Sequence, residues 1–328
     1  MYRIGIIGCG GMGSSHAANF ELTGRAKVTA AADPAEERAE TLASRYRAKP
    51  YQDGLEMLAR EDLDAVVVTT PTDLHARYAI AALERGRHVF AEKPIARTQS
   101  EASEMLAAAR KHEGKLMVGH VLRWWGEYLA AKRALEAGRV GKPAVARTVR
   151  GGSFPRPPSD WFADYARSGG VILDMMIHDL DWLRWCFGEV ERVYAKGLIP
   201  QNLDHCDYAL VILRFRNGVI AHAQGSWAYP GGFFTAFEIA GDGGLLEFDS
   251  QRAIPLQIQL RQQATAGPGV FVPSSPVTES PYLLEAREFL DYLDGKCQPR
   301  VTAEDACRAV EIALAALEST TSGKPVTL

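Results

Sequence analysis

The chain has 328 residues, 47% of them hydrophobic and 23% charged, and its net charge is −3. These values are typical of a folded protein with one large or two ordinary domains. The lack of a basic block gives no support for nucleic-acid binding. The sequence contains no run of about 18 apolar residues, the length that a membrane-spanning helix requires.

The five cysteines are scattered and form no Cys-x-x-Cys pair, as expected for free thiols in a reducing cytoplasm. Residues 205–207, His-Cys-Asp, are the tightest group of metal-ligand types. Adjacent residues of a strand point to opposite faces, so we predict no metal site there. Because Met1 leads directly into an apolar strand, we also expect no signal peptide and a cytoplasmic location.

A glycine-rich turn follows the first predicted strand, Tyr2–Ile7, and precedes a predicted helix. In this context G-x-G-x-x-G is typical of a dinucleotide-binding unit. Gly8 permits the tight turn, Gly10 lets the backbone approach a pyrophosphate, and Gly13 lets the helix pack on the strand. The helix N-terminus offers N–H groups to the phosphates. The turn residues expected to bind the cofactor are Gly8, Gly10, Gly11, Met12 and Gly13.

An acidic residue ends the second predicted strand, Lys27–Ala32. Asp33 lies 20 positions after Gly13, where a βαβ unit places a carboxylate against the adenosine ribose. Such a carboxylate accepts hydrogen bonds from a 2′-hydroxyl and repels a 2′-phosphate, so NAD is favoured over NADP. The alternative role for Asp33 is to cap the helix predicted at Ala35–Tyr46. Arg38 on that helix is counted with the cofactor residues because it could weaken the preference.

Strands and helices alternate up to about residue 121. Further strands are predicted at 65–69, 87–91 and 115–119, with helices at 55–60, 74–85 and 99–112. This alternation predicts a doubly wound parallel sheet, in which ligands bind beyond the carboxyl ends of the strands. That rule places on one rim Gly8–Gly13, Asp33, Thr70–Asp73, Glu92–Pro94 and His120. Of these, Thr70, Pro71, Glu92 and Lys93 join the residues expected to bind the cofactor. The Lys93 cation would face the cleft, and the alternative for it is an ordinary surface lysine.

The pattern then changes to successive strands. A helix at 125–137 and a strand at 143–150 precede strands predicted at 189–198, 207–215, 218–227, 235–240 and 244–248. Asn217-Gly218 is a hairpin signal. Strands joined by tight turns predict a large, mostly antiparallel open sheet, so an α+β domain at 122–328 would follow the first domain at 1–121. Residues 263–281 would be a linker or long loop, and helices at 283–294 and 303–321 would close the chain.

A helix is also predicted from Gly169-Gly170 to about Phe187. Asp174 and His178 are four positions apart, so on a continuous helix they share one face and touch. A carboxylate that sets the tautomer of an imidazole makes it a good general base. The alternative is a core helix with a satisfied His–Asp pair.

Together these motifs resemble the Gfo/Idh/MocA family of oxidoreductases, the relatives of glucose–fructose oxidoreductase and inositol dehydrogenase. The matching segments are G-x-G-x-x-G at 8–13, Thr70-Pro71-x-x-x-His75, Glu92-Lys93-Pro94, Gly169-Gly170 with Asp174-x-x-x-His178, Thr302-x-Glu304-Asp305 and Gly323-x-Pro325-Val326. The resemblance implies a Rossmann domain and a sheet domain whose open face mediates oligomerisation. It adds His75 to the cofactor residues and implies Lys93, Asp174 and His178 as the catalytic group.

Three residues depart from the family pattern. Ser168 stands where the first of three glycines usually lies, and Thr72 replaces a frequent asparagine. Met176 replaces a common glycine between Asp174 and His178, and we expect it to reshape or line the pocket.

The residues predict an NAD-dependent dehydrogenase of a sugar, glycoside or inositol-like cyclic polyol. His178 would accept the hydroxyl proton, Asp174 would orient it, and Lys93 would stabilise the developing negative charge. Aromatic faces beside polar groups suit such a ring. The further residues expected to bind the substrate are Arg123, Trp124, Arg150, Arg156, Trp161, Asp179 and His205. For each tryptophan the alternative is a core or interface position.

Two other functions fit the same fold. One is a glycosidase that uses tightly bound NAD for a transient oxidation, and free NADH in stoichiometric amounts would exclude it. The other is a non-catalytic dinucleotide-binding regulator, which need not keep Lys93, Asp174 and His178. We expect no nucleic-acid or membrane partner. Because an antiparallel sheet needs its second face covered, we expect a homodimer or homotetramer formed through the C-terminal sheet.

Overall fold

The computed structural model describes residues 1–156, 160–198, 205–252 and 279–328. Contacts divide the chain into two compact units, Met1–Trp124 with Ser274–Val310, and Trp125–Pro273 with Glu311–Leu328. This division differs from the expected 1–121 and 122–328, because the segment Ser274–Val310 near the C-terminal end belongs to the first unit. Most of the linker predicted at 263–281 lies outside the described residues, and a helix begins at Pro281.

The first unit has the predicted doubly wound parallel sheet. In the described part of the chain its strand order is β3-β2-β1-β4-β5-β6, with parallel pairing throughout. The strands are β1 (Tyr2–Ile7), β2 (Ala26–Ala32), β3 (Lys49–Tyr51), β4 (Ala65–Val68), β5 (His88–Glu92) and β6 (Leu116–Gly119). The sequence did not predict β3, since its three residues, Lys-Pro-Tyr, carry no apolar pattern.

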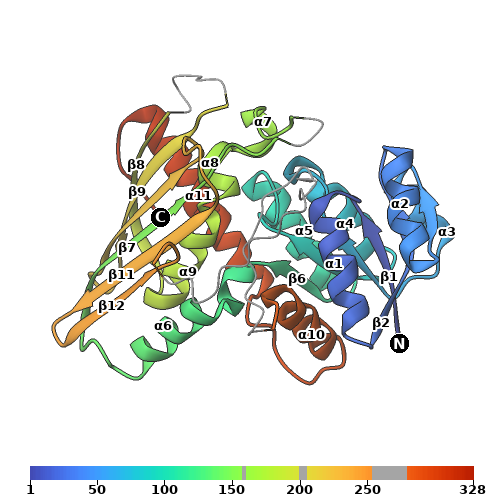
Figure 1. The fold of residues 1–328 in the computed structure, drawn as a ribbon, viewed down its shortest axis with the longest axis horizontal. Coiled ribbons are helices and arrows are strands. Elements are labelled where there is room, and N and C mark those ends of the chain that lie inside the picture. Colours follow the sequence, from blue (N-terminus) through green and yellow to red (C-terminus); the bar gives the residue numbers. More distant parts are fainter. Residues whose placement is uncertain (157–159, 199–204, 253–278) are drawn as a thin grey trace, which may run out of the picture. The chain divides into compact units, whose positions relative to one another are not determined.

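Helices follow or precede each strand of this unit (Figure 1). They are α1 (Gly11–Leu22), α2 (Glu36–Tyr46), α3 (Gly54–Arg60), α4 (His75–Leu83), α5 (Gln99–Lys111) and α10 (Pro281–Leu293), with 3₁₀ turns η1 (Thr72–Leu74) and η2 (Val121–Trp124). The last helix, α11 (Ala303–Ser322), begins in the first unit and ends in the second.

Aromatic packing explains why α10 belongs to the first unit. Phe20 of α1, Phe90 of β5 and Phe289 of α10 meet edge to face, with ring centroids 5.6–5.9 Å apart. All three rings are fully buried. Burying each side chain stabilises the fold by about 1.5–3 kcal/mol, so this contact holds α10 to α1 and β5 across the long sequence separation.

The second unit is the predicted α+β domain. In the described residues its sheet has the order β12-β11-β7-β10-β9-β8-β13, and only the β7–β10 pair is parallel. The strands are β7 (Pro143–Gly151), β8 (Val190–Gly197), β9 (Tyr208–Phe215), β10 (Ile220–Ser226), β11 (Phe234–Gly241), β12 (Gly244–Asp249) and β13 (Val326–Thr327). The helices are α6 (Gly126–Glu136), α7 (Tyr165–Ser168), α8 (Gly170–Asp174) and α9 (Ile177–Phe187). The short strand β13 was not predicted.

The two faces of this sheet differ. Along β9 every second side chain is buried, from Ala209 to Phe215, and those between are half-buried or exposed. Helices α8 and α9 contact β10 on the buried face. On the other face, Val145 and Ile220 are each 42% exposed. Among the described helices, none combines the length and apolar character that a membrane span requires.

Candidate functional site

The glycine turn after β1 has the geometry that a pyrophosphate requires. Gly8 has φ +99°, and a Cβ on Gly13 would lie 1.9 Å from the Gly8 carbonyl oxygen, so neither position tolerates a side chain. Thr69 Oγ1 donates to the same carbonyl over 2.7 Å and fixes the turn. A Cβ on Gly10, in contrast, would meet no other part of the described chain within 4 Å. Since no side chain caps α1, its first N–H groups face this open space, which fits the phosphates of NAD.

Asp33 is buried and already holds several donors. Its Oδ2 accepts the Cys9 N–H over 3.0 Å, and its Oδ1 accepts the Ala35 N–H over 2.9 Å. The Arg38 guanidinium also donates to Oδ1, from Nε at 3.0 Å and Nη2 at 2.7 Å. This hydrogen bond raises the pKa of Arg38. Oδ2 therefore keeps acceptor capacity for a ribose hydroxyl, whereas Arg38 is already engaged.

The turn that carries Lys93 is held from two sides. Glu92 Oε2 accepts the Lys93 N–H over 3.0 Å, and Glu92 Oε1 lies 2.6 Å from His16 Nε2. His75 contacts the Pro94 and Thr70 carbonyls, at 2.7 and 2.9 Å. Burial alone would raise the pKa of Glu92, but the His16 hydrogen bond and the nearby cations bring it below its usual value. Burial lowers the pKa of His75.

These contacts separate the predicted cofactor residues into two groups. The sheet order places the turns after β1, β4 and β5 at neighbouring strand ends, as predicted. Lys93, Thr70 and Pro71 are half-buried there. Glu92 and His75 instead direct their polar side-chain atoms to other protein groups, so they hold the main chain of the turns at these strand ends.

The predicted helix from Gly170 to Phe187 is interrupted. The N–H groups of Met175 and Met176 both bond to the Val171 carbonyl, over 3.1 and 2.8 Å, so the turn widens. Asp174 is consequently the last residue of α8 and His178 the second of α9. The prediction that both lie on one continuous helix was wrong. Asp174 is buried, and His178 is partly exposed.

The structure shows how Met176, which we expected to reshape or line the pocket, packs its side chain. Its side chain is fully buried and packs on β10 at Gly225, where a Cβ would stand 2.2 Å from Met176 Cγ. The missing side chain at Gly225 makes the room that Met176 occupies. The methionine thus anchors the break between α8 and α9 to the sheet.

Two further residues of the second unit support α8. Asp207, fully buried, accepts the Val171 N–H on Oδ2 and the Tyr208 N–H on Oδ1, both over 2.8 Å. Burial raises the pKa of Asp207 to about 6. Ser168 Oγ donates to the Phe162 carbonyl and accepts the Gly170 N–H, which gives this departure from the family pattern a local purpose. The sequence signal for Asp207 was weak: one acid at the start of an apolar strand.

Arg150 and Asp179, which were both expected to bind the substrate, form an ion pair with each other. The guanidinium donates to both carboxylate oxygens, over 2.6 and 3.2 Å, and both side chains are buried. Asp179 stands in the first turn of α9, beside His178. The pair therefore holds the start of α9 on β7, and breaking such a buried pair costs about 3–5 kcal/mol.

The remaining predicted substrate residues fall into two groups. Arg123 is buried and donates to the Arg300 carbonyl and to Asp305, while Trp124 Nε1 donates to Glu288. These contacts give both a structural role within the first unit. In the second unit Trp161 is half-buried and its ring stacks on that of Phe162, with the ring centroids 4.0 Å apart. Arg156 is exposed, and His205 contacts Asp160 over 2.9 Å.

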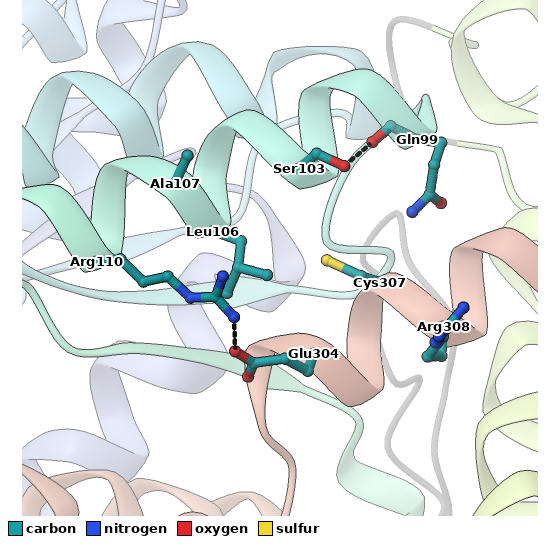
Figure 2. Close-up of a pocket in the computed structure, with 8 residues that line it drawn as sticks. All are labelled: Gln99, Ser103, Leu106, Ala107, Arg110, Glu304, Cys307 and Arg308. Carbon is teal, nitrogen blue, oxygen red and sulfur yellow. Dashed lines mark hydrogen bonds and ion pairs between the residues drawn. The ribbon is translucent and has the colours of Figure 1, made fainter.

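A surface pocket lies between α5 and α11, and none of the predicted site residues lines it. Figure 2 shows its lining, in which Arg110 bonds to Glu304 over 2.8 Å and Ser103 Oγ donates to the Gln99 carbonyl. None of its lining residues follows the carboxyl end of a sheet strand. We therefore do not connect it with the cofactor.

Known proteins share this arrangement. The GFO/IDH/MocA pattern, described as an oxidoreductase family with an NAD-binding Rossmann fold, matches residues 2–120, and the GFO/IDH/MocA C-terminal domain matches residues 128–247. The chain is 30% identical to the myo-inositol 2-dehydrogenase of Thermotoga maritima, covering 99% of this chain and 98% of that protein. It is 29% identical to the scyllo-inositol 2-dehydrogenase (NAD(+)) of Bacillus subtilis, covering 99% and 96%. GenD2 from gentamicin A biosynthesis, solved in complex with NAD, is similar with a TM-score of 0.90 at 27% identity, covering 100% of this chain and 96% of that chain.

Proposed function

Because the chain belongs to the GFO/IDH/MocA oxidoreductase family, we propose that it oxidises a secondary hydroxyl of an inositol-like polyol, a sugar or a glycoside. Family membership makes it an NAD-binding oxidoreductase, and the substrate class and residue roles are the proposed part. The observation that carries most weight is the Lys93 turn, held by Glu92 and His75 in the same sheet as the open glycine turn.

Each catalytic role follows from the chemistry of the side chain. Oxidation of an alcohol removes a hydride from carbon and a proton from oxygen, and NAD, when bound, accepts the hydride. The neutral imidazole of His178 takes the proton as general base, and Asp174 stabilises the imidazolium that results. The Lys93 ammonium donates a hydrogen bond to the reacting oxygen and lowers the cost of its negative charge.

Two observations support a cyclic polyol as the substrate. The relatives from Thermotoga maritima and Bacillus subtilis are named for the oxidation of inositols and span nearly the whole chain. In addition, the stacked Trp161 and Phe162 and the polar pair Asp160–His205 place an aromatic face near hydrogen-bonding groups within the second unit, which suits a hydroxylated ring.

A substrate panel tests this proposal. Aldoses, inositols, methyl glycosides and anhydrosugars are each incubated with NAD, and reduced cofactor is followed by absorbance. We expect turnover of at least one cyclic compound with a secondary hydroxyl. Good oxidation of open-chain alcohols with every cyclic polyol inert would refute the substrate class.

The same assay separates the alternative functions. A dehydrogenase releases one NADH for each substrate oxidised. Cleavage of a glycoside without net NADH would indicate the glycosidase with transient oxidation. Binding of NAD with no turnover of any compound in the panel would favour the regulator.

A further inference from the structure

Three buried side chains of the first unit form what we call the acid cluster: His16, Glu92 and Glu285. They belong to α1, to the end of β5 and to α10, and α1 contacts α10 directly (Figure 1). His16 bonds to Glu92 through Nε2, and its ring stands edge-on to Tyr282 of α10, with centroids 5.8 Å apart.

Glu285 has an unusual environment for an acid. Its side chain is 0% exposed, and neither carboxyl oxygen has a hydrogen-bond partner among the described residues. Ala286, Phe289 and Leu290 beside it on α10 are buried as well. An ionised carboxylate placed there without a partner is very costly. The proton therefore stays on the group.

The charges around Glu285 act in the same direction. Burial raises its pKa well above the usual value, and the carboxylates of Glu92 and Glu288 raise it further. The neighbouring α1 contributes His16, which is engaged with Glu92. The turn η2 contributes Arg123, which is engaged with Arg300 and Asp305. The His16 imidazole and the Arg123 guanidinium are thus both directed to groups other than Glu285.

The polar atoms that lack partners are complementary. A neutral Glu285 offers one O–H donor. His16 donates to Glu92 from Nε2, which leaves Nδ1 as an acceptor, and Nδ1 has no partner among the described residues. A buried water typically joins about three such groups. A hydrogen bond from the Glu285 O–H to His16 Nδ1, carried by one enclosed water, is the arrangement proposed below.

We propose that Glu285 is a positioning residue for the dehydrogenase reaction: as an uncharged acid it holds His16 through one enclosed water, and His16 and Glu92 in turn hold the main chain of Lys93. The proposal rests on the role proposed above for Lys93. The observed contacts run from His16 Nε2 to Glu92 Oε1 and from Glu92 Oε2 to the Lys93 N–H. The proposed link, from Glu285 to His16 Nδ1, completes this chain. If Glu285 ionises, its charge repels Glu92 and the Lys93 turn loosens.

The test compares Glu285→Gln with the wild type across pH. The amide keeps the shape but does not ionise. We expect the wild-type rate to decline by about tenfold on the alkaline side, less than the roughly 10²-fold effect of a 1 Å displacement of a reacting group. In Glu285→Gln that decline should move to higher pH. Glu288→Gln is the matched control, one turn along α10, where the carboxylate bonds to Trp124 and Arg300. It should lose stability, and because it removes a charge that raises the pKa of Glu285, it should move the alkaline decline to lower pH, the opposite direction to Glu285→Gln.

Two measurements without substrate keep the test independent of the proposed function. As pH rises, the unfolding midpoint of Glu285→Gln should increase relative to that of the wild type. Above pH 7, the wild-type protein should still show the infrared C=O band of a protonated carboxyl group. Identical alkaline profiles for wild type and Glu285→Gln, or the absence of that band, would overturn the proposal. Full turnover in Lys93→Ala would instead overturn the proposed function, while the midpoint and infrared results would still report on the cluster.

Discussion

At the scale of single residues, the catalytic roles can be separated from stability. Lys93 and His178 are both partly exposed, so replacing either by alanine should leave the fold intact. We expect Lys93→Ala and His178→Ala to reduce turnover by about 10²-fold or more, the usual size of acid–base and electrostatic contributions. Steady-state rates measure the loss.

Binding provides the control for this prediction. The predicted cofactor residues belong to the first unit and His178 to the second, so His178→Ala should still bind NAD, as followed by fluorescence titration. Near-normal turnover in His178→Ala would show that the His–Asp pair is only part of the core.

The cofactor preference is also decided by single residues. Asp33 should favour NAD over NADP, because its carboxylate repels a 2′-phosphate and holds Arg38 by two hydrogen bonds. Replacing Asp33 by serine removes the repulsion and frees the guanidinium for a phosphate. We expect Asp33→Ser to narrow or invert the NAD/NADP ratio of kcat/KM, and Asp33→Ser with Arg38→Ala to lose affinity for NADP. Equal wild-type efficiency with both cofactors would contradict this assignment.

At the scale of elements, the break between α8 and α9 depends on Met176 fitting against Gly225. A methyl group at Gly225 would overlap Met176 Cγ and Sδ. We expect Gly225→Ala to destabilise the protein by about 1–3 kcal/mol, the usual cost of overpacking, and to lower turnover because Asp174 and His178 flank the break. Met176→Ala combined with Gly225→Ala should recover part of the first loss in a double-mutant cycle. Additive losses would show that the two residues do not share this space.

The N-terminus of α8 should make stability depend on pH. Burial raises the pKa of Asp207 to about 6, so the folded protein binds this proton more tightly than the unfolded chain. The contribution is complete below about pH 4, the unfolded value, and is lost as pH rises through about 6. Denaturant midpoints should therefore fall from acid to neutral pH in the wild type relative to Asp207→Asn, which does not titrate. Parallel curves for the two proteins would contradict the raised pKa.

At the scale of the whole molecule, the partly exposed apolar side chains on one face of the second unit's sheet lead us to expect self-association. Val145 of β7 and Ile220 of β10 are adjacent partners in the sheet, and each is 42% exposed on that face. We expect a homodimer or homotetramer at micromolar concentration by light scattering, and Val145→Glu with Ile220→Glu should weaken it. A wild-type monomer would refute association through this sheet.

The local patterns of the sequence determined most of the architecture. The glycine turn, the β-branched strand β4 and the alternation along β9 each specify an element from neighbouring residues alone, because strand and helix periods are set within a few residues. The family motifs likewise led to the NAD-binding Rossmann fold, which the family match confirms. Short elements such as β3 and β13 were missed, since two or three residues carry no period and are defined by their pairing partners.

Only the tertiary structure determined which of the candidate side chains are already engaged in hydrogen bonds or packing with other parts of the protein. Arg150, Arg123 and Trp124 matched the chemistry of substrate binding, yet each is engaged by a partner far away in the chain. The break after Asp174 depends on Gly225, and the first unit includes α10 because Phe289 packs on Phe20 and Phe90. Such contacts join residues between 29 and 269 positions apart, and no local period encodes them. For the same reason, the buried carboxyl of Glu285, without a partner among the described residues, becomes apparent only once α10 is packed against α1.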